Sequence, residues 1–333
     1  MTSLSNARFN AEAAAWDANP DVHRASASAL DAILAAFPDL FGASKPSPDR
    51  TIDVLEIGCG TGLLSLRLAP YVSSLVAVDA AEGMIDALQM KLQGGAGVPG
   101  GGDSHNSEDN IGGKSEEETQ KENEMLRQTV HPLCIMLEDP EDPRLPPAAT
   151  TASESEKNRE SGQGPRKKFD LVISHLTLHH IPGSAFSSLL RTMHGCLKPA
   201  TGWVALTDYE DLVTDLVDSS IPPSSASPLS SCPPATGTTI PPHKDTTKFH
   251  PQAKLTGVEH PRGIHAPSFA ALMRGDGEDW AGFRDVDVRP AWTMKKDVER
   301  WPGEWGSEGK KPADKEVASM DFPFLLCRGR RGA

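Results

Sequence analysis

A carboxylate and three alternating glycines stand close together in the stretch VLEIGCGTG of residues 54–62. Glu56 lies two residues before Gly58, and Gly60 and Gly62 complete a G-x-G-x-G spacing. Glycine tolerates left-handed backbone conformations and lets the main chain approach a ligand closely. Glycine turns that bind the pyrophosphate of a dinucleotide are spaced G-x-G-x-x-G instead. Because a carboxylate would repel a pyrophosphate, Glu56 favours a ligand that carries an ammonium or a sulfonium.

The segments around the glycines predict the elements that hold them in place. Residues 52–58 form an apolar run typical of a buried strand, and the leucines of residues 62–69 suit a helix. A second strand is expected over residues 74–79, with Asp79 at its end and a helix over residues 81–92. At this place the Asp79 carboxylate can accept hydrogen bonds from both hydroxyls of a ribose. The alternative is that Asp79 only caps the following helix; we favour ribose binding.

Strands and helices alternate along the rest of the chain, which is typical of a parallel, doubly wound α/β sheet. Further strands are expected over residues 130–137, 168–174, 203–207, 283–288 and 324–327. Further helices are expected over residues 7–37, 183–197 and 268–273.

Four segments in this order resemble the class I S-adenosylmethionine-dependent methyltransferases, in the small-molecule methyltransferase type 11/12-like branch. They are VLEIGCGTGLLS (54–65), VAVDAAEGMIDAL (76–88), FDLVISHLTLHHI (169–181) and LKPATGWVALTD (197–208). The resemblance covers about residues 1–210 and continues more weakly over 249–328. It implies a Rossmann-like, mostly parallel seven-strand sheet in the order 3-2-1-4-5-7-6, with the seventh strand antiparallel. It also implies an enzyme that uses S-adenosyl-L-methionine as its cofactor.

The resemblance assigns cofactor contacts residue by residue. The glycine turn and Glu56 face the methionine part, as do Ser174 and His175, and Asp79 binds the ribose. Met84 packs on the adenine or is a plain core residue, and Glu138 with Asp139 lies near the adenine amino group or in an acidic surface loop. The predicted cofactor-binding residues are Glu56, Gly58, Cys59, Gly60, Gly62, Asp79, Met84, Glu138, Asp139, Ser174 and His175.

Histidines supply the predicted catalytic groups, which are His180 and His265. His180 belongs to an adjacent pair with His179, and an imidazole titrates near neutrality and can accept a proton. The alternative is that one ring of this pair hydrogen-bonds the loop while the other packs. His265 and His260 match a family segment that helps to cover the acceptor pocket.

Trp16 and Asp17 match the family's N-terminal cap, which closes over the cofactor; simple packing is the alternative. No metal site is predicted, because adjacent loop histidines are poor chelators without further ligands and the five cysteines contain no CxxC pair.

Charge and motifs limit the acceptor. The formal net charge of −13 opposes binding to a phosphate backbone, so no nucleic-acid partner is expected. The fourth strand is followed by His175-Leu-Thr-Leu rather than the Asn/Asp-Pro-Pro-aromatic loop of enzymes that methylate nucleic-acid amines. A small-molecule acceptor is therefore expected. A protein methyltransferase and a non-catalytic S-adenosylmethionine-binding protein remain as alternatives.

The chain is expected to form one domain. Residues 1–50 form a helical cap, residues 51–210 the cofactor-binding core, and residues 248–333 the last strands. Polar insertions near residues 94–128 and 150–168, and a Pro/Ser-rich one over 219–247, are too poor in apolar side chains to join a core and are expected to be disordered. The N-terminal stretch lacks the apolar core of a signal peptide, and no segment approaches the ~20 apolar residues of a membrane span. A cytoplasmic protein without a membrane partner is therefore expected.

Overall fold

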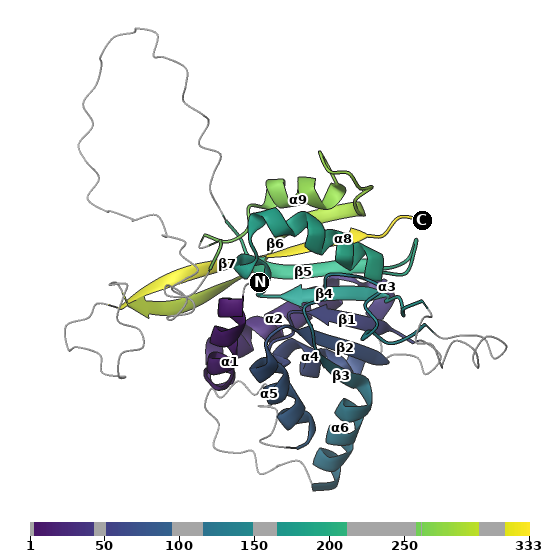
Figure 1. Ribbon diagram of the computed structural model, residues 1–333. Coiled ribbons are helices and arrows are strands. Elements are labelled where there is room, and N and C mark those ends of the chain that lie inside the picture. Colours follow the sequence, from purple (N-terminus) through teal and green to yellow (C-terminus); the bar gives the residue numbers. More distant parts are fainter. Residues whose placement is uncertain are drawn as a thin grey trace, which may run out of the picture.

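Seven strands of the chain form one sheet (Figure 1). The computed structural model describes residues 3–42, 51–94, 116–148, 165–211, 258–260, 262–299 and 317–333. The strands are β1 (Asp53–Ile57), β2 (Ser74–Asp79), β3 (Val130–Cys134), β4 (Leu171–His175), β5 (Trp203–Tyr209), β6 (Arg284–Glu299) and β7 (Val317–Arg330). Their order is β3-β2-β1-β4-β5-β7-β6. The first five are parallel, and β7 runs antiparallel to both β5 and β6. This confirms the predicted fold.

Helices cover both faces of the sheet. They are α1 (Ser3–Asp17), α2 (Pro20–Ala36), α3 (Pro38–Phe41), α4 (Leu63–Leu68), α5 (Glu82–Leu92), α6 (Glu116–Thr129), α8 (Phe186–Cys196) and α9 (Ala266–Arg274). On one face, α8 and α9 pack against side chains such as Val172 and Leu206. On the other face, α2, α4 and α6 pack against Val54 and Ile173. Because both faces are covered, the central strands are apolar along almost their whole length.

In the N-terminal cap, the two helices α1 and α2 replace the single helix that the sequence predicted over residues 7–37. The break falls at Asn19, whose side-chain oxygen accepts a hydrogen bond from the backbone N–H of Asp21. Pro20 then occupies the first turn of α2, where a missing N–H costs little. Trp16 and Asp17, in the last turn of α1, therefore lie at the bend between α1 and α2.

Helix α6 corrects the predicted insertion over residues 94–128. Residues 116–129 are helical despite seven acidic or amide side chains in its first nine positions, because one face carries apolar residues. Leu126 is 3 % exposed and packs in the same cluster as Leu75 of β2 and Val130 of β3. Burial of one apolar stripe can hold a polar helix in place. Of the other two insertions, residues 219–247 and all of 150–168 except its last four residues lie outside the described residues.

The last two strands are far longer than the predicted ranges 283–288 and 324–327. Beyond the sheet they continue as a two-stranded ribbon, which Figure 1 shows projecting past the other strands. Met294 and Phe322 are paired across this ribbon and pack with Val22 of α2. Lys296 makes an ion pair with Asp21 of α2, with 2.8 Å between Nζ and Oδ2. The ribbon thus holds the first turns of α2 against the sheet edge.

Strand β3 ends at Cys134, three residues before the predicted end, and leaves residues 135–138 as a loop at the carboxyl edge of the sheet. None of the helices in the described ranges combines the length and the apolar character that crossing a bilayer requires.

Candidate functional site

The glycine turn connects β1 to α4 at the carboxyl edge of the sheet. Gly58, Gly60 and Gly62 have φ values of +74°, +55° and +80°, which L side chains rarely adopt. A Cβ at Gly58 would lie 2.4 Å from Oγ1 of Thr177, and one at Gly62 would lie 2.3 Å from Cδ1 of Leu88. A Cβ at Gly60 would meet nothing within 4 Å. Packing therefore explains two of the glycines, whereas Gly60 borders open space that a ligand can enter.

Asp79 ties the end of β2 to this turn. Its Oδ2 accepts a hydrogen bond from the backbone N–H of Gly60 at 2.9 Å, and its Oδ1 accepts one from Ala81 at 2.8 Å. Burial raises the pKa of this carboxyl, and the backbone donors oppose that rise. The N-cap position of α5 is occupied by Ala81, so Asp79 is not the N-cap residue of that helix. Each of its oxygens retains a lone pair for a ligand donor.

Two pockets meet at the turn and share Gly58, Asp79 and Thr177. The first pocket extends from the glycines toward α1 and α2, and the second extends over the loop after β3 toward α8. The first is lined by Phe9, Trp16, Val22, Ser26, Glu56, Gly58, Cys59, Gly60, Thr61, Leu63, Leu64, Asp79, Met84, His175, Leu176, Thr177 and His180. The second is lined by Ile57, Gly58, Val78, Asp79, Ala80, Ile135, Met136, Leu137, Glu138, Thr177, Ile181, Ala185, Ser188, Leu189 and Thr192. The two pockets therefore adjoin at the carboxyl edge of the sheet.

Most of the sequence-predicted site residues lie on these pockets. The exceptions, which line neither pocket, are Gly62, Asp139, Ser174 and His265. Ser174 donates its hydroxyl to the carbonyl of Ile57 at 2.7 Å and so links two strands. The Asp139 carboxylate accepts the backbone N–H of Glu141 within a turn.

The C-terminal histidines lie outside both pockets as well. The imidazole Nδ1 of His265 lies 2.7 Å from Oγ of Ser268, at the start of α9. Nε2 of His260 lies 3.0 Å from the carbonyl of Ile181, and its ring stacks on Phe186 with 5.0 Å between centroids. His260 thus supports the loop that follows β4.

Glu56 lines the first pocket and is buried, with 1 % of the residue exposed. Burial raises the pKa of this carboxyl to about 8, and the neighbouring charge of Asp79 adds to the rise. The hydroxyl of Ser65 donates to Oε2 and opposes it. Glu56 therefore holds a proton near neutrality, and a cation placed beside it would favour the ionised form.

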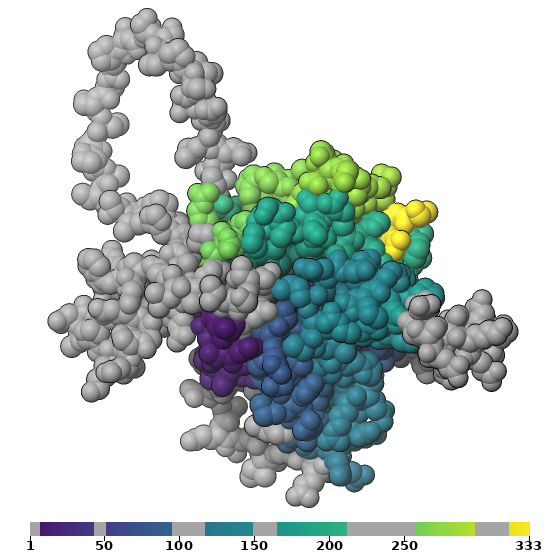
Figure 2. All heavy atoms as spheres, in the orientation of Figure 1, coloured from purple at the N-terminus to yellow at the C-terminus, as the bar shows by residue number. Residues whose placement is uncertain are grey.

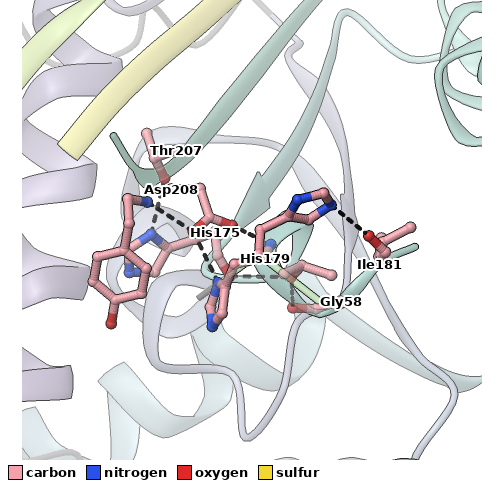
Figure 3. Close-up of polar contacts among 9 residues, drawn as sticks. Gly58, His175, His179, Ile181, Thr207 and Asp208 are labelled. Carbon is pink, nitrogen blue, oxygen red and sulfur yellow. Dashed lines mark hydrogen bonds and ion pairs between the residues drawn. The ribbon is translucent and has the colours of Figure 1, made fainter. Parts of the chain in front are cut away.

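A histidine-rich turn follows β4, and Figure 3 shows its polar contacts with the end of β5. His179 donates its backbone N–H to Oδ2 of Asp208 at 3.1 Å, and its Nδ1 lies 2.8 Å from Oδ1 of the same carboxylate. The ring of His180 lies 3.9 Å from that of His179 and 5.1 Å edge-on from Phe9. The buried Asp208 thereby fixes the turn, and His180 is the member of the pair that lines the pocket.

The N-terminal cap is tied across the glycine turn. The Asp17 carboxylate accepts a hydrogen bond from the hydroxyl of Thr61. It also forms an ion pair with Lys91, with 2.7 Å between Oδ1 and Nζ. Asn10 accepts the backbone N–H of Gly83 at 2.9 Å, and Figure 2 shows α1 lying directly beside α5. Trp16 and Phe9 consequently form one wall of the first pocket.

Sequence reasoning missed several residues of the site. Thr177 separates the two pockets, and its hydroxyl lies 3.3 Å from the carbonyl of Gly58 and 3.1 Å from that of His175. Asp208 is 1 % exposed and lies near the end of β5. It directly follows the predicted strand of residues 203–207, and this position could have identified it. Phe9 and Ser26 carried no local signal, because only the packing of α1 and α2 brings them to the pocket.

A family model described as a methyltransferase domain matches residues 22–271 of the chain. A search of curated protein sequences gave no match. Among solved structures, the chain is similar to a methyltransferase-like protein of Bacillus halodurans C-125, at 14 % identity over 90 % of this chain and 99 % of that one, with a TM-score of 0.47. It is also similar to the YcgJ protein of Bacillus subtilis, at 12 % identity over 92 % and 98 % of the two chains, with a TM-score of 0.47.

A third similar structure is the magnesium protoporphyrin IX methyltransferase of Synechocystis PCC 6803 with bound SAH. It is 13 % identical over 92 % of this chain and 82 % of that one, with a TM-score of 0.39. At TM-scores below 0.5, these structural similarities support no conclusion about the substrate.

Proposed function

Because the chain belongs to the methyltransferase-domain family, whose model matches residues 22–271, we propose that it transfers a methyl group from S-adenosylmethionine to a small-molecule acceptor. The observation that carries this proposal is the meeting of two pockets at Gly58 and Asp79, with Glu56 at the base of one of them. A single elongated ligand with a cationic end, a ribose and a nucleobase needs a carboxylate such as Glu56, an acceptor such as Asp79 and an adjoining second pocket next to one another.

The residues present fit this cofactor. The open space beside Gly60 admits the ligand next to the main chain, and the Asp79 oxygens have lone pairs for two ribose hydroxyls. Glu56 is available to balance the positive charge of the methionine end. The second pocket offers Glu138 and apolar side chains such as Ile135 and Leu137 as contacts for the adenine ring of the cofactor. When bound, the cofactor supplies a methyl carbon that its sulfonium activates toward a nucleophile.

The chain's contribution to the reaction is mainly placement. Phe9, Trp16 and Leu176 exclude water from the first pocket and hold the acceptor against the methyl carbon, and such orientation can account for much of the rate. An acceptor that loses a proton also needs a base. His180 lines this pocket, so we assign it that role. With S-adenosylmethionine bound, the acceptor atom would bond to the methyl carbon as the carbon–sulfur bond breaks and its electron pair stays on sulfur, and His180 would take the proton that the acceptor loses.

Two features favour a small acceptor over a macromolecule. The inner wall of the first pocket is formed by α1 and α2 together with the turn after β4, and it is mostly apolar. The net charge of −13 also opposes the binding of a nucleic acid.

Methyl transfer should be tested with S-adenosylmethionine labelled in the methyl group and a metabolite extract as the source of acceptors. We expect the label to enter the small-molecule fraction, and His180→Gln to lower the rate about a hundredfold while cofactor binding stays within about twofold. His131→Gln, an exposed histidine on β3, is the matched control and should leave the rate unchanged. Label that appears only in protein would contradict the small-molecule acceptor, and an active His180→Gln would contradict the assigned base.

A further inference from the structure

The first pocket divides into two halves of different character. One half is the glycine turn with Glu56 and Asp79. The other half, here called the acceptor half, comes from α1, α2, the end of β4 and the turn that follows β4. Its apolar members are Phe9, Trp16, Val22 and Leu176, and its polar members are Ser26, His175 and His180.

The acceptor half contains no lysine, arginine, aspartate or glutamate among the described residues that line it. Charged residues of α1 and α2 that lie next to these lining residues in the sequence are paired within the protein. Arg8, which precedes Phe9, makes an ion pair with Glu12. Asp17 is held by Lys91, and Asp21 is held by Lys296 at 2.8 Å. A carboxylate, phosphate or ammonium group would lose its hydration in this half without gaining an opposite charge, which costs free energy.

The polar atoms of this half also differ in what they can offer a ligand. The hydroxyl of Ser26 donates to the carbonyl of Val22 within its own helix. His175 is 9 % exposed, and its Nδ1 lies 2.8 Å from Oγ1 of Thr207 (Figure 3). Its Nε2 is buried and has no hydrogen-bond partner among the described residues. An unsatisfied buried nitrogen costs stability that a ligand group can recover.

Burial lowers the pKa of His175 to about 4, so its ring is neutral at physiological pH. In a neutral imidazole Nε2 is either a donor or an acceptor, depending on the direction of the hydrogen bond to Thr207. A hydroxyl group can match either case, since it both donates and accepts. A carboxylate only accepts hydrogen bonds, so it matches Nε2 only when Nε2 is the donor, and it brings a charge into the pocket.

We propose that the methyl acceptor is an uncharged, largely apolar molecule that presents a hydroxyl group to Nε2 of His175. This inference rests on the proposed methyl transfer and specifies its acceptor. It assigns His175 to the recognition of the acceptor, in addition to its place near the methionine end of the cofactor.

The test uses the full chain saturated with S-adenosylhomocysteine, whose binding is measured first by calorimetry. Aromatic and aliphatic scaffolds are then titrated into this complex, each as a matched alcohol, carboxylate and primary ammonium. We expect the alcohol of the best scaffold to bind at least about tenfold more tightly than its charged counterparts. A protein that does not bind S-adenosylhomocysteine would contradict the proposed function itself. If S-adenosylhomocysteine binds, equal or tighter binding of the charged forms, or no binding of any alcohol, would overturn the inference alone.

Variants of His175 test the contact with the hydroxyl. His175→Phe keeps a planar ring and should weaken binding of the alcohol about tenfold, without changing binding of the deoxy analogue. His175→Gln places a polar atom near the position of Nε2 and should recover most of that loss. Equal losses for the alcohol and the deoxy analogue would show that His175 only shapes the pocket. The comparison of charges on the unmodified chain remains decisive if a variant does not fold.

Discussion

Replacing Asp79 with serine should weaken the binding of S-adenosylmethionine by about tenfold to a thousandfold. Two charge-assisted hydrogen bonds to the ribose are each worth on the order of 1.5–3 kcal/mol. Serine offers one uncharged oxygen in place of the two oxygens of the carboxylate. Asp79 lines both pockets and already accepts the N–H groups of Gly60 and Ala81. Serine should therefore also lower the free energy of unfolding by about 1–3 kcal/mol.

A second aspartate separates these two effects. Asp170 lies just before β4 begins. Its carboxylate accepts a hydrogen bond from the backbone N–H of Asp53 at 2.9 Å and forms an ion pair with Lys198. Asp170→Ser should lose a similar amount of stability and bind the cofactor like the unmodified chain. Calorimetric titration and urea unfolding of both variants give the two quantities. If Asp79→Ser retained full affinity, the ribose contact would be excluded, and its role would be to hold the turn.

Replacing Glu56 with glutamine should remove a dependence of stability on pH. The carboxyl has a pKa of about 8 in the folded chain against 4.5 as its ordinary value. Between these values the folded state holds a proton that the unfolded state has released, so stability falls as pH rises through this window. The slope approaches about 1.4 kcal/mol per pH unit in the middle of the window. Glu56→Gln keeps the shape of the side chain and cannot ionise, so this slope should be absent.

The Glu56 carboxyl should give cofactor binding the opposite dependence on pH from that of stability, and the same substitution should remove it. A cation beside Glu56 favours the carboxylate, so binding should release a proton and tighten as pH approaches about 8. Glu56→Gln should bind S-adenosylmethionine more weakly and with little dependence on pH. Thermal unfolding and calorimetry across the window measure both effects. Parallel pH profiles of stability for the two proteins would mean that Glu56 is ionised in the free protein.

The sequence predicted the site best where a local pattern required it. The G-x-G-x-G spacing and the strand-end Asp79 lie where the two pockets meet. Both are local features, because the glycines take positive φ values and Asp79 accepts the backbone N–H of Gly60 in the same turn. The order of the seven strands came from the resemblance to a family rather than from spacing. Residues set by packing between distant elements were missed: Thr177 is recognisable only by its contact with Gly58.

The same distinction explains the errors in the fold. Helix α6 is too polar for a composition-based prediction, and only its packing shows that Leu126 and Met125 attach it to the core. The outer halves of β6 and β7 gain their stability from pairing with each other and from contact with α2, and neither is visible in the strand segments taken singly. The site roles of Asp139 and His265 came from the resemblance to a family and stay predictions. In the structure, local hydrogen bonds hold both side chains, and neither residue lines one of the two pockets.

Calorimetric titration of the full chain with S-adenosylmethionine, and separately with NAD, tests the central claim most directly. The G-x-G-x-G turn, Glu56 and Asp79 together lead us to expect saturable binding of S-adenosylmethionine with one ligand per chain and no measurable binding of NAD. Binding of NAD without binding of S-adenosylmethionine would contradict the account of the site as a methyl-donor pocket.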